Sequence, residues 1–472
     1  MDIGSKISKL RKSRKMTQTE LANILGVSLQ AVSKWENGIS MPCAEHLGML
    51  YNIFGGDLFS DTDGIAENEN FRKNMTGIKD IYKIGRGPSS SHTIGPETVC
   101  KRLNELYPDA TSYKIILYGS LAKTGKGHRT DYVIKKTLKC ENAEVIFDSA
   151  TVTEHPNTMR CIAYKGNKQI GEHTAISIGG GDVIFDGEIM PKAEIVYKQS
   201  NFSEISAYCK EHNIKLWEYV FRNEQNIADY LATVWDKMVA SVKNGLNDEG
   251  ILPGGLNVHK KAKQLLESEH VDETPETREN RLICAYAFAV SEQNASAQTI
   301  VTAPTCGAAG VLPAVLYYEQ QKHNYSDEKI CKALATAGIV GSVIKTNASI
   351  SGAECGCQAE IGSACAMAAA ALGELFDLSI DKIEYAAEIA LEHHLGLTCD
   401  PVCGLVQIPC IERNAVAAMR AINAVSLASL LWQTRKISFD NIVKTMKETG
   451  NDLLRSYRET SEGGLAKNYN AK

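Results

Sequence analysis

Cysteines gather in one stretch of the second half of the chain, many of them beside glycine or proline. Thiolates are ligands for soft metals and iron–sulfur clusters, and an adjacent glycine lets a cofactor approach the backbone. No two of these cysteines have the two-residue separation of a zinc ribbon or a ferredoxin motif, so their spacing does not select a metal. Buried thiols that pack as small apolar side chains are the alternative. Six cysteines lie within 56 residues: Cys355, Cys357, Cys365, Cys399, Cys403 and Cys410.

Two glycine-rich segments could bind a small anion. Gly85–Thr93 places three serine hydroxyls and an imidazole after a Gly/Pro turn, which suits a carboxylate or a phosphate. A serine-rich turn that caps the helix at Glu97 explains the same residues. Tyr118–His128 puts Lys126 and His128 on a glycine-rich loop after a strand, where ligand sites are common, but it lacks the spacing of a P-loop.

The elements that must position these groups are of two kinds. Residues 77–200 combine short β-rich runs with helical segments such as Glu97–Leu106, which predicts an α/β domain with a mixed sheet. After Phe202 strands are hard to find, and Ala, Leu, Glu and Lys dominate, which predicts a large, mostly helical domain. The expected strands are Ser112–Tyr118, Ala143–Phe147, Met159–Tyr164 and His173–Ile178, and the expected helices are Ile227–Lys243, Thr277–Gln293, Asp327–Leu334, Gly362–Phe376 and Ile383–His394.

The first 60 residues predict a small all-α domain. Thr17 and Glu20 have the spacing of a capping box for a helix that ends at Leu25, Gly26 supplies a turn, and Ser28 caps a second helix. Helix, glycine turn and helix in this order are typical of a helix-turn-helix. We expect its small core to be formed by Leu21, Ile24, Leu25, Val27, Val32 and Trp35.

Residues 17–38 resemble the repressor-type helix-turn-helix of bacterial regulators. The resemblance implies that Gln30, Ser33 and Lys34 face the major groove of DNA and that Gln18 reaches a phosphate. Such modules read paired half-sites, so DNA binding would require a homodimer. A module that serves only protein contacts is the alternative.

Length, composition and charge fit a multidomain globular protein. The chain has 472 residues, 44% of them hydrophobic, which allows about two to four domains. We expect a helix-turn-helix domain over 1–60, a linker over 61–76, an α/β domain over 77–200 and a helical domain over 201–472. Residues 1–60 carry seven Lys/Arg and five Asp/Glu, a basic head on a chain of net charge −5, which is a weak indication of nucleic-acid binding.

The sequence gives no sign of export or of a membrane span. Met1–Lys15 is polar and basic, without the apolar core of a signal peptide. Ser363–Gly373, the longest run of small residues, is far short of the ~20 residues that cross a bilayer. We therefore expect a cytoplasmic protein with no membrane contact, in which the 14 cysteines do not form a disulfide framework.

Taken together, the motifs after the linker resemble those of one family, the bacterial iron–sulfur L-serine dehydratases. The resemblance covers about residues 78–472 and implies a β-chain-like α/β domain fused to an α-chain-like helical domain. It rests on the ordered motifs Gly87–Pro96, Tyr118–Asp131, Gly179–Gly181, Thr302–Gly307, Ser349–Gln358, Leu395–Val402, Gln407–Asn414, Tyr457–Ser461 and Gly463–Ala466.

The resemblance implies a [4Fe-4S] cluster held by Cys357, Cys399 and Cys410, with a fourth iron that meets the substrate. Dehydration of L-serine removes a weakly acidic Cα proton and expels hydroxide, a poor leaving group. An iron with an open position can act as a Lewis acid on the hydroxyl, and a base takes the proton. The aminoacrylate product then becomes pyruvate and ammonia.

The resemblance also implies roles for polar residues in the family motifs. His128 is favoured as the base, and His92 is the second candidate, because imidazole is the usual base near neutral pH. We expect Ser89, Ser90, Ser91 and His92 to surround the substrate carboxylate. Lys126 and Asn347 are weaker candidates for substrate binding, and a structural role is the alternative for each polar residue.

The chain departs from the family pattern at several cysteines. Many relatives end in a cysteine that reaches the free iron, whereas this chain ends in Asn468–Lys472. Cys306 stands where many relatives have Asn, and Cys355 and Cys403 replace small or apolar residues. We hypothesise that one of these, Cys403 first, occupies the fourth iron instead.

Three other functions compete with the dehydratase interpretation. L-cysteine could be the substrate of the same elimination, with sulfide as the leaving group. A pyridoxal-phosphate deaminase with Lys345 as its Schiff-base lysine would leave the cysteines unexplained. A transcription regulator could use a dehydratase-like body to sense serine or the cluster, but a pure sensor would not need the histidines.

Overall fold

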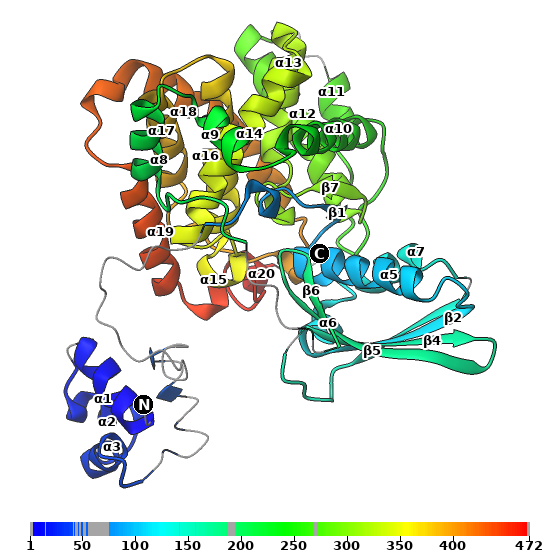
Figure 1. Cartoon of the computed structure of the whole chain (residues 1–472), viewed down its shortest axis with the longest axis vertical. Coiled ribbons are helices and arrows are strands. Elements are labelled where there is room, and N and C mark those ends of the chain that lie inside the picture. The colour runs from blue at the N-terminus through cyan, green and yellow to red at the C-terminus, as the bar shows by residue number, and fades with distance from the viewer. Residues whose placement is uncertain are drawn as a thin grey trace. The chain divides into compact units, whose positions relative to one another are not determined.

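The computed structural model describes most of the chain and divides it into two units, Met1–Arg72 and Lys73–Lys472 (Figure 1). Residues 61–74 of the predicted linker lie outside the described residues. The described residues are 3–14, 16–40, 42, 46, 49–50, 53–54, 75–140, 142–155, 157–186, 188, 194–268 and 272–469.

The first unit contains the predicted helix-turn-helix. Its helices are α1 (Ile3–Ser13), α2 (Gln18–Leu25) and α3 (Leu29–Glu36). The predicted capping box is confirmed, because Thr17 accepts from the Glu20 backbone and the Glu20 carboxylate accepts from the Thr17 N–H. The second predicted cap is also confirmed, since the side chain of Ser28 accepts from the N–H of Ala31 at 3.3 Å.

The core of this unit differs from the prediction at one residue. Leu21, Leu25, Val32 and Trp35 are buried as expected, but Ile24 is 58% exposed. Ile24 lies on the outward face of α2, because a helix of eight residues can bury only one stripe of side chains. The core is closed instead by Ile7, Ala22, Leu50 and Phe54.

The second unit opens its α/β region with a five-stranded mixed sheet. The strand order is β3–β2–β4–β5–β6, with β2 parallel to β3 and the other neighbours antiparallel. Each of the four predicted strands lies within an observed strand of this sheet, and of its five strands the sequence analysis missed only the short β6. The strands are β2 (Ser112–Tyr118), β3 (Asn142–Asp148), β4 (Thr158–Lys165), β5 (Lys168–Gly179) and β6 (Asp182–Phe185).

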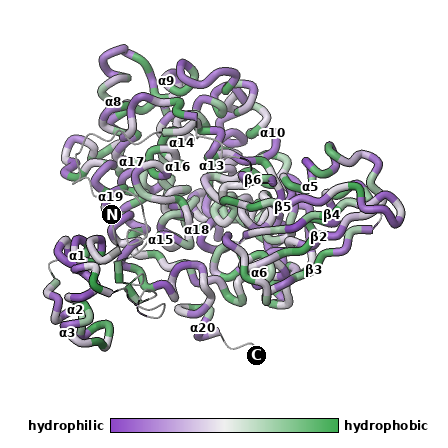
Figure 2. Tube along the Cα trace, turned by 60° about the horizontal axis from the view of Figure 1, so that its bottom comes forward, coloured by the Kyte–Doolittle hydropathy of each residue, from purple (hydrophilic) through white to green (hydrophobic). Residues whose placement is uncertain are grey.

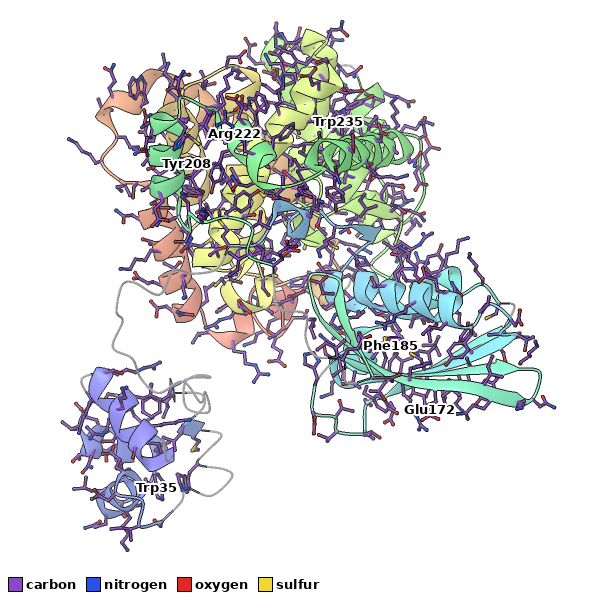
Figure 3. All side chains as sticks on the ribbon, viewed as in Figure 1. Trp35, Glu172, Phe185, Tyr208, Arg222 and Trp235 are labelled. Atoms are coloured by element: carbon purple, nitrogen blue, oxygen red, sulfur yellow. The ribbon has the colours of Figure 1, made fainter. Side chains whose placement is uncertain are left out.

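One face of the sheet packs against α5 (Gly95–Leu106) and α7 (Thr130–Thr137). Buried and half-buried residues alternate along β2. The strands of the sheet carry both hydrophilic and hydrophobic residues (Figure 2). Phe185 lies between the sheet and α5, whereas Glu172 lies on the opposite face, where it pairs with Arg160 at 2.6 Å (Figure 3). The short helix α6 (Gly119–Thr124) follows β2 directly.

The chain enters the α/β region from the helical core and returns to it. Residues 75–82 pack in the helical core, and β1 (Ile84–Arg86) pairs antiparallel with β7 (Thr299–Val301). Met75 and Tyr197, on the two sides of the α/β region, form a β-bridge. The α/β region is therefore an insertion within the helical fold.

The helical region is built around α16 (Ser363–Leu375), in which every residue is buried. Its run of alanines lets α13, α14, α17 and α18 approach closely. The other helices are α8 (Phe202–Glu211), α9 (Leu216–Asn223), α10 (Ile227–Leu246), α11 (Ala262–Glu267), α12 (Pro275–Ala295), α13 (Val311–His323), α14 (Asp327–Asn347), α15 (Gly352–Cys355), α17 (Ile380–Glu392), α18 (Cys410–Leu431), α19 (Phe439–Asp452) and α20 (Gly464–Asn468).

One helix among the described residues is long and apolar enough to cross a membrane, by length and composition only. It runs over Cys410–Thr434 and includes α18. The sequence analysis considered only the run of small residues at Ser363–Gly373 and did not identify this longer apolar helix. One face of α18 packs on α12, α16 and α17, which is the arrangement of a core helix, while Val416, Leu427, Leu430 and Leu431 are exposed on the other side.

Candidate active site

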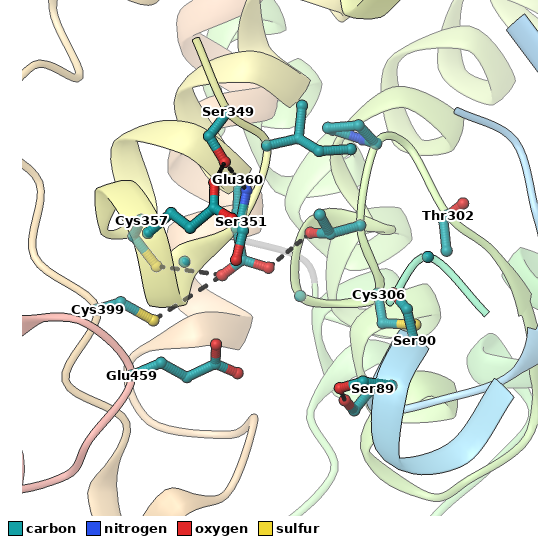
Figure 4. A pocket seen from close by; sticks show the side chains of 18 of the residues that line it. Ser89, Ser90, Thr302, Cys306, Ser349, Ser351, Cys357, Glu360, Cys399 and Glu459 are labelled. Atoms are coloured by element: carbon teal, nitrogen blue, oxygen red, sulfur yellow. Dashed lines mark hydrogen bonds between the residues drawn. The ribbon is translucent and has the colours of Figure 1, made fainter. Parts of the chain in front are cut away.

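A cavity of about 530 Å³ lies between the α/β region and the helical region. Ser89–Ser91 and Asp182 line it from the first region, and residues of the cysteine motifs line it from the second (Figure 4). Neither region forms this cavity by itself. A cavity with several converging polar groups is the usual form of a small-molecule site.

The structure brings the three predicted cluster cysteines to this cavity. Cys357 lies between α15 and a single π-helical turn, Cys399 follows α17, and Cys410 begins α18. All three are buried, and all three line the cavity. The Sγ atoms of Cys357 and Cys399 and a carboxylate oxygen of Glu360 lie within 4.8 Å of one another.

Proximity makes these thiols unlike ordinary buried cysteines. The hydrogen bond that the protonated Cys399 thiol makes with Cys357, and then burial, raise the pKa of Cys399 well above its ordinary value. Burial, and then the charge of Cys357, raise the pKa of Cys410 in the same way. A metal bound at these sulfurs would relieve the mutual repulsion of their thiolates, so the donor set fits a metal centre.

Glu360 is a site residue to which the sequence analysis gave no role. One of its carboxylate oxygens accepts from the Thr305 hydroxyl at 2.7 Å, and the other lies 4.0 Å from Cys357 Sγ and 3.9 Å from Cys399 Sγ. Gly352 leaves room for this contact, because a Cβ there would lie 2.7 Å from the carboxylate and 3.1 Å from Cys399 Sγ. Its position three residues after Cys357 was the available signal.

The serine segment forms the opposite side of the cavity. Ser89, Ser90 and Ser91 line it, at a π-helical turn that leads into α5. Ser89 also caps this turn, since its hydroxyl accepts from the His92 N–H at 3.2 Å. The predicted cap of the helix at Glu97 is wrong, because α5 begins at Gly95 without a side-chain cap, and anion binding by the segment stays a prediction. The Ser90 hydroxyl lies 3.8 Å from Cys306 Sγ.

His92 and His128 lie together behind the serine segment. Their ring centroids are 4.7 Å apart, and neither is among the residues that line the cavity. His92 Nδ1 is 2.9 Å from the Ser91 hydroxyl, and Nε2 is 3.1 Å from the Ser120 hydroxyl. Burial, and then the neighbouring His128, lower the pKa of His92 to about 3, and burial lowers the pKa of His128. Both rings are neutral at pH 7.

The other predicted substrate residues lie outside the cavity. The Lys126 ammonium lies 5.5 Å from the Phe147 ring centroid, in the α/β region. The Asn347 amide donates to the carbonyl oxygens of Ser200 at 2.7 Å and Val343 at 3.0 Å, which fixes the end of α14. Lys345 does line the cavity, but its ammonium is paired with Asp80 at 3.0 Å.

The cysteines at which the chain departs from the family pattern do not all reach the cavity. Cys306 is buried and lines the cavity. Cys403 is exposed and is not among the lining residues, and Cys355 is buried beside Gly450. All 13 cysteines in the described part of the chain are free.

The predicted DNA-facing residues lie on the helix-turn-helix. Gln30 and Lys34 are exposed on α3, and Ser33 is half-buried. Gln18 donates to Glu36 at 2.8 Å, and the same carboxylate is paired with Arg11 at 2.6 Å. In the free protein the Gln18 amide therefore already has an acceptor.

Comparison with known proteins agrees with this arrangement. The family described as serine dehydratase alpha chain matches residues 132–466, serine dehydratase beta chain matches 77–148, and a helix-turn-helix family matches 7–58. Fold and site therefore define a lyase with the alpha-chain and beta-chain regions on one polypeptide. This chain belongs to the serine dehydratase family.

The alignments with curated relatives cover almost the whole length of each relative. "L-serine dehydratase 2" of Escherichia coli is 38% identical over 83% of this chain and 98% of its own length. "L-serine dehydratase" of Streptomyces coelicolor and "L-serine dehydratase" of Helicobacter pylori are also 38% identical, with the same coverage of both chains.

Proposed function

We propose that this protein dehydrates and deaminates L-serine to pyruvate and ammonia with the help of a [4Fe-4S] cluster. Family membership and the names of the relatives support the substrate and the reaction. The observation that carries the cofactor is the convergence of Cys357, Cys399 and Cys410 on one cavity, opposite a wall of serine hydroxyls. A cytoplasmic location, suggested by the free thiols, belongs to the same proposal.

The three cysteines are the proposed ligands of the cluster. Thiolates are the usual ligands of such clusters. Among the described residues, four cysteines line this cavity: these three and Cys306. When bound, a cluster with one iron free of protein thiolate supplies a Lewis acid for the substrate hydroxyl. Glu360, in contact with two of the sulfurs, fixes the surroundings of the metal centre.

The residues of the chain supply binding and proton transfer. We assign the substrate carboxylate to the hydroxyls of Ser89–Ser91, which are short donors on a rigid turn. We assign the Cα proton to the His92–His128 pair, because both imidazoles are neutral at pH 7 and can accept one. The hydrogen bond between Ser91 and His92 links this pair to the cavity. Aminoacrylate then leaves, tautomerises and hydrolyses.

Anaerobic purification with iron, sulfide and pyruvate assays on one sample tests the proposal. We expect about four irons and four sulfides per chain and serine-dependent release of pyruvate. Relative rates on L-serine, L-cysteine and L-threonine test the substrate. A reconstituted protein that holds no cluster would overturn the cofactor, and a loaded protein without turnover would favour a sensor.

We also propose that the first unit binds DNA as part of a homodimer. The fold of residues 17–36 and the exposure of Gln30 and Lys34 on α3 support this second activity. In this proposal Gln30, Ser33 and Lys34 contact base edges, and Gln18 exchanges Glu36 for a phosphate. The catalytic unit would then couple serine metabolism to transcription.

A further inference from the structure

The carboxylates that line the cavity differ in their partners. Four of the five are already engaged, each by a hydroxyl or an ammonium group. Glu459 is the exception, since its carboxylate makes no hydrogen bond or ion pair with the residues that the structure describes. The four engaged pairs are Asp80 with Lys345 (3.0 Å), Asp182 with Lys83 (3.0 Å), Glu354 with Ser349 (2.6 Å) and Glu360 with Thr305 (2.7 Å).

Glu459 is held in place by its backbone rather than by its side chain. Its N–H donates to the Cys399 carbonyl at 2.7 Å, and the Cys399 N–H donates to the Tyr457 carbonyl at 2.8 Å. The segment is fixed further by the Ser461 hydroxyl, which donates to the Pro401 carbonyl at 2.8 Å. The side chain of Glu459 projects into the cavity on the same side as Cys399 (Figure 4).

The backbone of Glu459 is in a conformation that side chains other than glycine rarely adopt. Its φ is 58°, in the left-handed region. Such a residue costs about 1–2 kcal/mol and persists only where the surroundings determine it. The backbone conformation therefore fixes the direction in which the Glu459 side chain leaves the segment.

The cavity around Glu459 lacks a free positive charge. Its two lysines, Lys83 and Lys345, are both paired with aspartates. Glu459 is exposed to the open cavity, and among the described residues that line it, its carboxylate is the one without a hydroxyl or ammonium partner. A small cation that enters the cavity would therefore find an unpaired carboxylate at this position.

We propose that Glu459 binds the ammonium group of the substrate and so selects an amino acid over a hydroxy acid. This inference rests on the proposed function and adds to it the residue that recognises the amine. The substrate is then bound at two groups: serine hydroxyls bind its carboxylate, and Glu459 binds its ammonium group. Two fixed contacts on a small substrate also orient its hydroxyl and its Cα proton.

The test uses two ligands that lack a β-hydroxyl and differ only at the amine. L-alanine carries the ammonium group, and L-lactate carries a hydroxyl in its place. Their dissociation constants are measured by calorimetry on the anaerobic, cluster-loaded full chain, so the readout does not depend on turnover. We expect Glu459→Gln to weaken the binding of L-alanine by about 10-fold, the size of a hydrogen bond to a charged group, and to leave the binding of L-lactate unchanged.

Activity and control variants complete the design. Glu459→Gln is expected to raise the KM for L-serine by about 10-fold and to change kcat less, whereas Glu459→Asp retains part of the affinity. Glu462→Gln, at an exposed position three residues later, should match the wild type. Equal weakening of L-alanine and L-lactate, or no weakening of either, would overturn the inference.

The same samples separate this inference from the proposed function. A wild-type protein that binds no iron would contradict the proposed function. A wild type that is loaded and active, with a Glu459→Gln variant that binds L-alanine equally well, would contradict only the inference. A variant that loses iron and sulfide would show that Glu459 serves the cluster instead of the ammonium, and it too would overturn the inference.

Discussion

Arg413 forms an ion pair with Asp400 at 3.2 Å, and both side chains are largely buried. The same guanidinium donates to the Thr398 carbonyl at 2.6 Å. Arg413 lies on α18, which begins at Cys410, while Asp400 and Thr398 flank Cys399. One guanidinium therefore fixes two of the three cavity cysteines relative to each other. The Asp400 carboxylate also accepts from the Leu465 N–H at 2.7 Å, which ties in the C-terminal segment.

Arg413→Lys should loosen the cysteine site without removing a thiol. A lysine ammonium cannot reproduce the fork that joins two acceptors, so we expect several-fold faster loss of iron in air. Asp400→Asn leaves the guanidinium without its counter-charge and should lower the free energy of unfolding of the iron-free chain by about 3 kcal/mol. Iron content over time and urea denaturation measure the two effects. Arg420→Lys, on the same helix outside the cavity, should show neither.

Replacement of any one of Cys357, Cys399 and Cys410 by serine should prevent stable cluster binding, because all three thiolates are proposed ligands of the cluster. Iron and sulfide analysis after anaerobic reconstitution checks this. Cys365→Ser is the matched control, since Cys365 is fully buried nearby but bonds to the Ala417 carbonyl and does not line the cavity. Full iron content in any one of the three variants would remove that cysteine from the site.

The buried histidines predict an unusual pH dependence. The pKa of His92 is lowered to about 3 and that of His128 is lowered as well, so both stay deprotonated below the ordinary value of 6.5. We expect kcat/KM to hold as the pH falls from 7 to 6, and His92→Asn and His128→Asn to reduce kcat by about 10²–10⁴-fold. His212→Asn, at an exposed surface position, is the control. An acid limb centred at or above pH 6.5 would contradict the assignment.

Glu388 predicts a stability that falls as the pH rises. One of its carboxylate oxygens is buried without a hydrogen-bond partner in the described structure, and burial raises the pKa to about 7 from 4.5. The folded state therefore binds this proton more tightly than the unfolded state, and the contribution is lost between pH 4.5 and 7. Glu388→Gln should be more stable than the wild type at pH 8 by about 1–2 kcal/mol and no more stable at pH 4. Urea denaturation of Glu388→Gln beside Glu448→Gln, an exposed control on α19, tests the sign.

DNA binding by the full chain should depend on α3. We expect binding to a mixed-sequence duplex at low salt, with an affinity that falls steeply as salt increases. Lys34→Ala should weaken binding several-fold, and Gln30→Ala should change the sequences recovered by selection. Lys444→Ala, an exposed lysine on α19, is the charge-matched control. Absence of binding at low salt, for monomer and dimer alike, would contradict the proposal.

Local signals in the sequence predicted local structure well. The caps at Thr17 and Ser28 set both helices of the helix-turn-helix, and alternation identified four of the strands. The prediction for α14 stopped at Leu334, whereas the helix continues to Asn347, because residues 333–344 are buried on all sides and show no amphipathic period. The exposed position of Ile24 follows from tertiary packing, which a local pattern does not contain.

The site was predictable only in part. The motifs identified the cysteines, but the contacts of Glu360 with Thr305 and the approach of Glu459 to Cys399 join residues about 55–60 positions apart. Such pairs form through the packing of α15, α18 and the C-terminal segment, and spacing along the chain does not reveal them. The neighbourhood of His92 and His128 likewise depends on how α5 meets α7.

The β-bridge between Met75 and Tyr197 makes the two halves of the cavity separately adjustable in evolution. Because the chain leaves and rejoins the helical core at adjacent points, the inserted region can change in length or sequence without rerouting that core. Ser89–Ser91 belong to the insertion, and Cys357, Cys399 and Cys410 belong to the core. The wall of serine hydroxyls can therefore change in sequence while the wall of cysteines stays constant.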